Sequence, residues 1–470
     1  MIILPTDSTD PKNKFSTISE AFLQRKGLPF SNVLSPESIQ KAFLDENGMF
    51  GQQDLFSTQI VLWAFLAQTL RDGKGAACSQ AVADIATYRV QTGRRPPAGD
   101  TGDYCRARAK LSPAALRRLV VDSARQINSC TEASWRWKGL NAKLVDGFTF
   151  TMPDTPTNQK AFPQLTSQTP GVGFPIARAC VVLSLATASI CDMAFGPYQG
   201  KETGETALLR EILDTFDEND VVVLDRYYCS FLMLALLAQR GVHVCTRLHQ
   251  RRSSDFRRGR RLGPGDHLIT WTRPARPPWM SQKEYEKIPE TLTLREVRFD
   301  VTVAGRRTET LTVVTTLTDP DEYSPQDIAE LYGFRWNAEL DIRQIKQTLG
   351  LDHLRCKSPE MIRREVWVTL LAYNLIRKVI ATAAAVHDKQ PRQLGFALAC
   401  QTVLSSWMLL STGWCRDARG LCRTALAQIA ANEVGNRPGR IEPRVLKRRR
   451  HRYPLMQRSR RELREELQTT

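Results

Sequence analysis

Residues 221–230, VVVLDRYYCS, combine four consecutive apolar residues with a single aspartate, Asp225, at their end. A short β-branched run of this kind is typical of a strand buried on both faces of a parallel sheet. Helical patterns lie on both sides, at 204–220 and 230–241, and a second apolar run follows in VHVCTRLH. Strands that alternate with helices in this way predict a mixed α/β core.

Upstream of this unit the sequence predicts three more strands. Apolar and β-branched residues dominate 142–152, 175–190 and 191–200, and short turn-like segments separate them. The expected order is therefore three strands, then helix, strand, helix, strand. The cluster His243, Cys245 and His249 lacks a fourth nearby ligand, so a buried strand is favoured there over a zinc site.

The flanking segments have different patterns. Residues 250 to about 320 alternate as strands do and predict an all-β insertion, whereas 324–350 have a helical pattern between Ser324 with Pro325 and a closing glycine, Gly350. Helices are also expected over 112–127, 358–386 and 391–431, followed by a basic tail. We predict five segments: a helical N-terminal domain (1–135), a core in two parts (136–250 and 321–385), a β-rich insertion (251–320), and a helical C-terminal region with a basic tail (386–470).

The charge balance indicates a polyanionic partner. The chain has 470 residues, with 66 Lys and Arg against 49 Asp and Glu, and its net charge is +17. Nucleic acid is the leading candidate for that partner. The 11 cysteines form no C-x-x-C pair, which favours reduced thiols in a cytoplasm. No signal peptide and no run of about 18 apolar residues is visible, so we expect a soluble intracellular protein without a membrane partner.

Two aspartates occupy unusual places in the predicted core. Asp225 ends its apolar run, and Asp146 lies in a similar one, KLVDG. Aspartate is disfavoured inside strands, whereas the carboxyl ends of strands in open α/β sheets are where such folds hold their chemistry. For a single aspartate, a turn or a hydrogen bond to a backbone amide is the favoured explanation.

The third acidic candidate, Glu339, lies among cations in YGFRWNAELDIRQIK, residues 332–346. On one continuous helix, a spacing of three or four residues puts Glu339 on the same face as Tyr332, Arg335, Arg343 and Lys346. The alternative is a solvated face with ion pairs worth about 0.3–0.5 kcal/mol each.

Convergence of the three acids would explain the surplus of cations. Carboxylates about 4 Å apart repel each other by roughly 4 kcal/mol per pair at an effective dielectric constant near 20. Two divalent ions would offset that repulsion and would support phosphoryl transfer. Arginine and lysine beside such a site are best used on phosphates.

At this point the sequence resembles the IS4-type DDE transposases, bacterial insertion-sequence enzymes whose signature is Tyr, two residues, Arg, three residues, Glu, six residues, Lys. That signature is complete here as Tyr332, Arg335, Glu339 and Lys346. The resemblance extends to VDGFTFTMPDT, VVLDRYY and KSPEMIRREVWVTLLAYNLIR, and covers residues 140–380. It implies an α/β RNase H-like core in which Asp146, Asp225 and Glu339 are the catalytic residues. In that reading they bind two Mg²⁺ ions, for which Mn²⁺ would substitute.

The resemblance also implies DNA contacts. Tyr332 and Arg335 would hold the backbone near the cleaved end, and Lys346 would contact a phosphate. We add Arg343 because of its place on the helix face, and Arg226 because it follows the second aspartate. Relatives carry a tryptophan in the insertion that stacks on an extruded base, and the present insertion has Trp271 and Trp279, with a buried core role as the alternative for each.

One position departs from the family pattern. Phe148 stands where relatives more often have a small hydroxyl residue. Asp154, in MPDT, is therefore the fallback for the first acid. Asp146 is preferred because Asp154 follows a proline in a loop-like segment.

We therefore expect a cut-and-paste transposase that acts on the inverted-repeat ends of its own element and joins them to target DNA. The resemblance implies a homodimer in the DNA complex and a protein of the bacterial cytoplasm, associated with the nucleoid. End recognition is expected in the N-terminal domain, and the basic clusters 251–261 and 447–461 are expected to contact DNA unless they are a solvated loop and a solubilising tail. The alternatives are an RNase H-like structure-selective DNA nuclease and a catalytically silent DNA-binding protein derived from a transposase.

Overall fold

The structure is a computed structural model that describes residues 34–44, 46, 48–51, 55–91, 95–301, 309–411, 417–435 and 455–469. The first 33 residues of the predicted N-terminal domain lie outside the described residues. So does most of the predicted basic cluster at 447–461.

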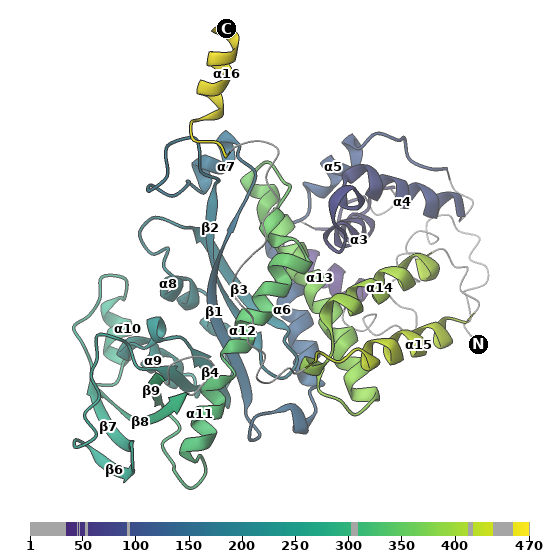
Figure 1. The fold of residues 1–470 in the computed structure, drawn as a ribbon. Helices are drawn as coiled ribbons and strands as arrows, with labels where there is room; N and C mark the ends of the chain where they lie inside the picture. The colour runs from purple at the N-terminus through teal and green to yellow at the C-terminus, as the bar shows by residue number, and fades with distance from the viewer. Residues whose placement is uncertain are drawn as a thin grey trace.

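A single mixed sheet forms the centre of the molecule (Figure 1). In the described chain it has nine strands, in the order β3-β2-β1-β4-β5-β9-β8-β7-β6. The three strands at one end are antiparallel, whereas β4 runs parallel to β1, and β5 parallel to β4. These five core strands are β1 (Asn141–Thr151), β2 (Ile176–Ser184), β3 (Ile190–Pro197), β4 (Asp220–Leu224) and β5 (His243–Arg247). The predicted order of strands and helices is confirmed.

The predicted insertion continues this sheet and does not form one of its own. Strand β9 pairs antiparallel with β5, so the insertion strands extend the core sheet from that edge. They are β6 (Arg260–Gly263), β7 (Asp266–Thr272), β8 (Thr291–Val301) and β9 (Glu309–Thr315). The prediction of an all-β insertion is wrong in one respect. The segment also contains a short helix, α10 (Gln282–Lys287), which begins at a Ser281–Glu284 capping box.

Helices cover both faces of the core sheet (Figure 1). On one face lie α6 (Pro113–Ser129), α12 (Trp336–Arg343) and α13 (Pro359–Val386), and on the other lie α8 (Glu205–Arg210) and α9 (Phe231–Ala238). Alternate strand residues divide between two apolar cores, since Leu144 and Val223 belong to the first and Val145 and Val222 to the second. Helix α6 begins as predicted, with the Ser112 side chain accepting a hydrogen bond from the Ala115 amide at 3.3 Å.

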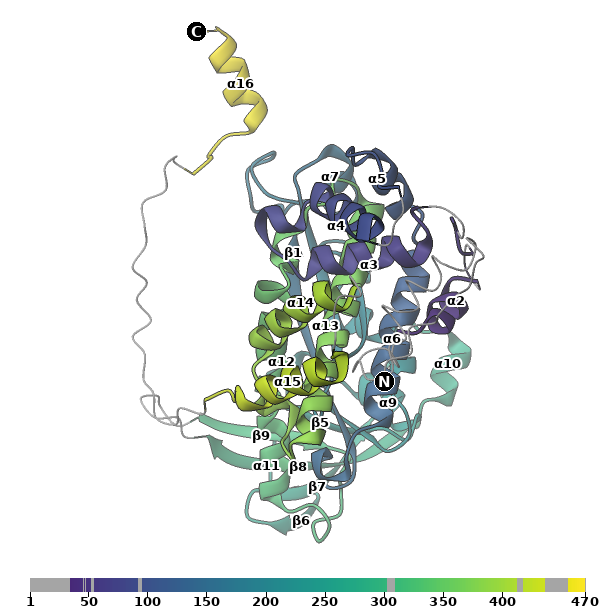
Figure 2. The ribbon, with the colours of Figure 1, turned by 90° about the vertical axis from the view of Figure 1, so that its right-hand side faces the viewer.

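The remaining helices form a layer outside α13 (Figure 2). They are α2 (Pro36–Leu44), α3 (Thr58–Thr69), α4 (Cys78–Gln91), α5 (Gly102–Arg108), α14 (Phe396–Ser411) and α15 (Ala418–Ala431). Their buried side chains, from Leu34 to Ile429, belong to the same apolar core as the sheet. The helical N-terminal region therefore shares its core with the sheet. Two short helices, α7 (Pro156–Ala161) and α16 (Arg460–Thr469), lie at one end of the molecule.

Helix α13 is the core helix of the fold. Among the described residues it alone is long and apolar enough to cross a membrane, but 83% of its apolar window is buried inside the structure. That burial explains its apolar composition.

The segment predicted as one helix over 324–350 is divided into three parts. Helix α11 (Pro325–Gly333) begins at the predicted Ser324 cap, where Ser324 Oγ accepts from the Asp327 amide at 3.2 Å. The chain tightens at Arg335, whose amide donates to the Tyr332 carbonyl, and α12 follows. A π-helical turn, Gln344–Thr348, then leads to Gly350 at a φ of 72°, as its predicted closing role requires.

Candidate active site

The register of two parallel strands brings the predicted aspartates together. The pairing of β1 with β4 runs from Asn141 and Asp220 to Leu144 and Val223. Asp146 and Asp225 follow two residues after Leu144 and Val223, respectively. Both continue the side of the sheet that carries Leu144 and Val223, which is the side covered by α12.

Asp146 is partly buried, and one of its carboxylate oxygens accepts from the Gly147 amide at 2.9 Å. Burial raises the pKa of Asp146 to about 6. The Gly147 amide and the Arg335 charge oppose the rise, and the charges of Asp225 and Glu339 add to it. The three predicted acids therefore share one electrostatic environment.

Asp225 follows β4 directly and precedes a short 3₁₀ turn, Arg226–Tyr228. Its backbone carbonyl accepts from Thr246 Oγ1 at 3.1 Å and from the Tyr228 amide at 3.1 Å. These bonds hold the turn against β5. The carboxylate is only partly buried at the carboxyl edge of the sheet, where open α/β folds bind their ligands.

Glu339 reaches this edge from α12, and Arg335 lies between it and the sheet. Arg335 Nη2 donates to Glu339 Oε1 at 3.0 Å, while Arg335 Nη1 lies 3.6 Å from Asp146 Oδ2. The contact with Glu339, four residues along the same helix, is also expected from the alternative of a solvated helix face. The contact with Asp146 is not, because Asp146 lies on β1, and one guanidinium therefore joins two of the three acids.

The other predicted cations do not form a single stripe, as a continuous helix would require. Lys346, in the π turn, donates to the Thr149 carbonyl of β1 at 3.0 Å and lies 3.2 Å from Asp352. Arg343 is exposed, and Arg226 donates to Gln250 Oε1 at 3.5 Å. The break after α11 and the π turn change the direction of successive side chains, which is why the single-face prediction is wrong.

Tyr332 is buried on α11 beside this group. Burial raises its pKa to about 12, so its hydroxyl stays protonated at neutral pH. A neutral phenol donates a hydrogen bond without adding charge.

The two predicted tryptophans lie in different environments. Trp271 is buried in the second apolar core, and Arg252 covers its ring at 3.9 Å. Trp279 is 36% exposed, and Arg210 lies 3.9 Å from its ring centre. A third tryptophan, Trp336, is 56% exposed on α12, next to Arg335. Sequence reasoning missed Trp336, although an aromatic residue within an otherwise charged stretch was visible.

A fourth acid, Glu205, was also missed. It lies on the opposite face of β1, where a side chain at Gly147 would overlap the Glu205 carboxyl. Tyr228 donates to Glu205 Oε2 at 3.4 Å. Burial raises the pKa of Glu205, and the charge of Asp225 adds to the rise. The visible signal was the glycine after Asp146, which allows this close approach.

Asp154, the fallback for the first acid, lies beyond the end of β1. It is exposed, and its carboxylate accepts from Gln159 Nε2 at 2.9 Å. The structure thus brings Asp146, and not Asp154, to Asp225 and Glu339.

The donor atoms suit a divalent metal, because carboxylate oxygens are the ligands that Mg²⁺ prefers. Mutual repulsion among the acids, which adds to the raised pKa of Asp146, is the property that a bound cation relieves. In the described residues no three His, Cys, Asp or Glu side chains are close enough to hold one ion as they stand. In this arrangement Arg335 supplies the positive charge between two of the acids.

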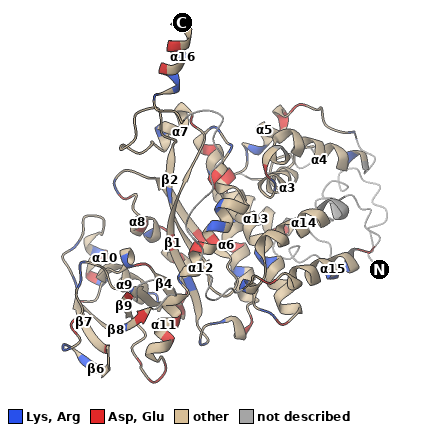
Figure 3. Cartoon of the chain, viewed as in Figure 1, with Lys and Arg blue, Asp and Glu red and all other residues tan. Residues whose placement is uncertain are grey.

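Residues 251–261 form a basic segment that leads from β5 into β6, where Figure 3 shows Lys or Arg in blue, and we call this segment the insertion loop. Two contacts anchor it to β7 and β8. Ser254 donates to Glu296 of β8, and the Phe256 ring stacks on buried His267 of β7, with the ring centres 4.4 Å apart. His267 is itself paired with Glu296 at 3.1 Å. The anchors leave six arginines exposed: Arg251, Arg252, Arg257, Arg258, Arg260 and Arg261.

Comparison with known proteins gives consistent matches. Residues 137–375 match the family model for the transposase DDE domain. The chain is 26% identical over 427 residues to the transposase InsG of insertion sequence IS4 from Escherichia coli, covering 90% of this chain and 92% of that protein. It is 39% identical over 75 residues to the transposase of insertion sequence IS421 from E. coli, which covers 16% of this chain and 19% of that one. A solved piggyBac transposase synaptic complex with hairpin DNA is similar at a TM-score of 0.41 and 9% identity, covering 92% of this chain and 88% of that one.

Proposed function

This chain belongs to the family of proteins with a transposase DDE domain and is an IS4-type DNA transposase, and on that premise we propose that Asp146, Asp225 and Glu339 are its catalytic acids. The observation that carries the assignment is the register of β1 with β4, which aligns the two aspartates on the side of the sheet that α12 covers. Arg335 forms ion pairs with both Asp146 and Glu339, and this shared contact supports Glu339 as the third acid.

DDE transposase domains use divalent metal ions, and the proposed ions here are two Mg²⁺, replaceable by Mn²⁺. When bound, such ions activate the attacking oxygen and stabilise the leaving oxygen of the phosphodiester. The protein's own part is to hold three carboxylates on separate elements at one sheet edge. Arg335 keeps Asp146 and Glu339 from repelling each other while the site is assembled.

The cations around the acids are proposed to bind the DNA backbone. Arg335 carries a planar fork suited to phosphate oxygens, and Tyr332 is a neutral hydrogen-bond donor beside it. Arg343 on α12, Lys346 in the π turn and Arg226 in the turn after β4 are proposed to add further phosphate contacts. Double-stranded DNA at the element's ends and in the target is the proposed partner.

Exposed aromatic rings could hold a base that leaves the helix. Trp279 and Trp336 both present ring surface to solvent, although Arg210 lies over the Trp279 ring, whereas Trp271 is buried. Stacking on an aromatic ring offsets the cost of extruding a base. Trp279 is therefore the better of the two predicted tryptophans, and Trp336 is an additional candidate.

The finer parts of the proposal follow the family resemblance. They are a cut-and-paste reaction at inverted repeats, an RNase H-like identity for the core, a homodimer in the DNA complex and a place in the bacterial cytoplasm. The five predicted segments, with end recognition in 1–135, complete the proposal.

The test is cleavage and joining on DNA that carries the terminal repeats flanking the reading frame. With Mn²⁺, the wild-type protein is expected to cut at the repeat ends, and pre-cut ends are expected to join a target plasmid. Asp225→Asn should abolish both reactions. Asp154→Asn, an exposed acid outside the group, should leave both unchanged.

Three results would count against the proposal. Equal product from Asp225→Asn and wild type would remove Asp225 from the mechanism. Cutting without joining would indicate a nuclease. Binding of the ends with no cutting by wild type would indicate a silent DNA-binding protein.

A further inference from the structure

Glu339 lies on a helix of eight residues, α12, and a helix of that length is not stable by itself. Side chains on its inner face must therefore set its orientation. From their contacts we propose that Asp341 and Arg377 are positioning residues, which set the rotation of α12 and so the placement of Glu339 and Lys346. This inference rests on the proposed function and names residues that act through the catalytic group.

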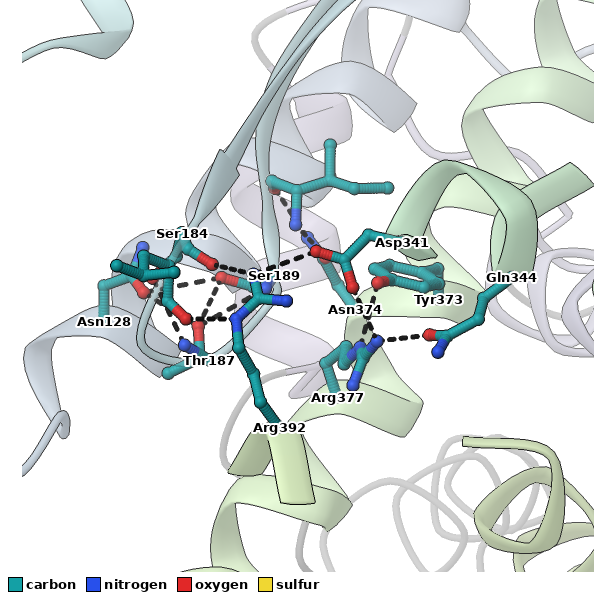
Figure 4. Close-up of polar contacts among 12 residues, drawn as sticks. Asn128, Ser184, Thr187, Ser189, Asp341, Gln344, Tyr373, Asn374, Arg377 and Arg392 are labelled. Atoms are coloured by element: carbon teal, nitrogen blue, oxygen red, sulfur yellow. Dashed lines mark hydrogen bonds and ion pairs between the residues drawn. The ribbon is translucent and has the colours of Figure 1, made fainter. Parts of the chain in front are cut away.

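Asp341 is the inward-facing acid of α12, two residues after Glu339, and is only 2% exposed. Its two carboxylate oxygens face different arginines (Figure 4). Oδ1 accepts from Arg377 Nη2 at 3.2 Å, and Oδ2 lies 2.9 Å from Arg392 Nη2. A carboxylate held on both oxygens cannot turn without losing an ion pair, so the backbone of α12 is held with it.

Arg377, on α13, is equally buried and joins three groups at once. Its Nε donates to the Tyr373 hydroxyl at 2.9 Å, and its Nη2 donates both to Asp341 and to Gln344 Oε1. Gln344 is the first residue of the π turn. One guanidinium therefore holds the middle of α12 and the start of the turn that follows it.

Arg392 connects the same acid to the sheet. It lies on the short 3₁₀ turn Pro391–Gln393 and donates to the Ser184 carbonyl at 3.0 Å and to the Leu185 carbonyl. Ser184 ends β2, the neighbour of the strand that carries Asp146. The network thus joins the Glu339 helix to the sheet that carries the aspartates.

Buried ions are a poor way to gain stability, because desolvation offsets most of their attraction. Their better-attested use is to specify one arrangement among several. Apolar residues would fill the space between α12 and α13, but they would not define the rotation of α12. A rotation by one residue would turn Glu339 away from Asp146.

The π turn extends the effect to Lys346. Its extra residue per turn directs the Lys346 side chain to β1, where Nζ donates to the Thr149 carbonyl at 3.0 Å. Because Arg377 holds Gln344 at the start of the turn, the same arginine sets the places of both Glu339 and Lys346. Loss of its fork would loosen both.

Two variants test this. Asp341→Asn removes the charge at constant shape, and Arg377→Lys keeps a charge but loses the fork that reaches three partners. For both, the rate of single-turnover cleavage is expected to fall about 10- to 100-fold, as misplacement of a catalytic group does. The Mn²⁺ concentration for half-maximal cleavage should rise about tenfold, whereas affinity for end DNA should fall less than tenfold, because Lys346 is only one of several proposed phosphate contacts.

Asn374→Ala is the matched control. Asn374 is fully buried one turn before Arg377, and its amide joins α13 to the Val120, Ser123 and Ile190 groups, not to α12. It should lower the melting temperature while leaving the metal requirement unchanged. If Asp341→Asn and Arg377→Lys behave like this control, the inference is overturned.

A second measurement separates this inference from the proposed function. Electron paramagnetic resonance measures Mn²⁺ binding to the DNA-free protein, and both variants should bind it more weakly than wild type. Unchanged Mn²⁺ affinity in the variants would overturn the positioning role, whether or not the wild-type protein cleaves DNA. Failure of the wild-type protein to cleave DNA would count against the proposed function alone. If neither variant folds, Tyr373→Phe removes one hydroxyl from Arg377, and an unchanged Mn²⁺ requirement in that variant would also overturn the inference.

Discussion

Asp146 shows how a proposed catalytic position opposes stability. Its pKa rises from 3.8 to about 6, chiefly because it is buried. Below about pH 3 the group is protonated in both the folded and the unfolded chain and has no effect. As the pH rises from about 3 to 6, the unfolded chain ionises more readily, so the folded state loses stability. The penalty is complete above about pH 7.

Replacing Asp146 with asparagine should therefore stabilise the protein at neutral pH. A shift from 3.8 to about 6 corresponds to about 3 kcal/mol in the free energy of unfolding. We expect Asp146→Asn to be more stable than wild type by about that amount at pH 8 and equal to it at about pH 3, by urea denaturation. Exposed Asp154→Asn should change little at either pH. The same difference at both pH values would show that burial of charge is not the cause.

Two glycines in the segment from α11 to Gly350 show how the backbone conformation of a single residue ends a helical element. Gly350 ends it in a left-handed conformation, with φ at 72°. No atom lies within 4 Å of where its side chain would be, so only the backbone conformation disfavours another residue. Gly333, at the end of α11, has the same open space but no such conformation.

This pair gives a matched prediction. Gly350→Ala should lower the free energy of unfolding by about 1 kcal/mol, because alanine is strained at positive φ. Gly333→Ala should raise it by about 0.5 kcal/mol, since alanine restricts the unfolded chain more than glycine does. Thermal denaturation of both variants measures the difference, and effects of the same sign would contradict the conformational explanation.

The apolar core that the N-terminal helices share with the sheet determines which parts of the chain can fold alone. Buried residues of α3 and α6 pack against α13 in the same core as β1 and β4. A fragment that begins at residue 136, the predicted boundary, would expose the inner face of α13. We expect it to be insoluble or to lack a cooperative melting transition, compared with the full chain. A soluble fragment with cooperative unfolding would show that the sheet folds alone.

The charge of the whole molecule predicts how binding depends on salt. Each phosphate neutralised by an arginine contributes about 0.9 to the slope of log Kd against log salt. The double variant Arg260→Gln and Arg261→Gln, on exposed β6, should lower that slope by about 1.8. Arg257→Gln should have a smaller effect, because Arg257 is already paired with Asp255 at 2.9 Å. Equal slopes in the double variant and wild type would place the insertion loop away from DNA.

Local patterns were enough for much of the fold. The apolar runs before Asp225 and around Asp146 specified strands, and Ser112 and Ser324 marked the helix starts, because burial period and capping are properties of a few neighbouring residues. The family signature likewise needed only spacing. Helix α10 and the π turn were not predicted, since short helices and single extra residues leave weak local patterns.

The sequence by itself determined the order of the core strands and helices and the basic charge, and it indicated three candidate acids. Only the tertiary structure decided which groups meet: Asp146 beside Asp225 through strand register, and Arg335 between Asp146 and Glu339. It also revealed Asp341 with Arg377 and Arg392, residues that are 36 and 51 positions further along the chain. The reason is physical, because capping and periodicity act between neighbours in sequence, whereas a buried ion pair depends on packing between distant segments.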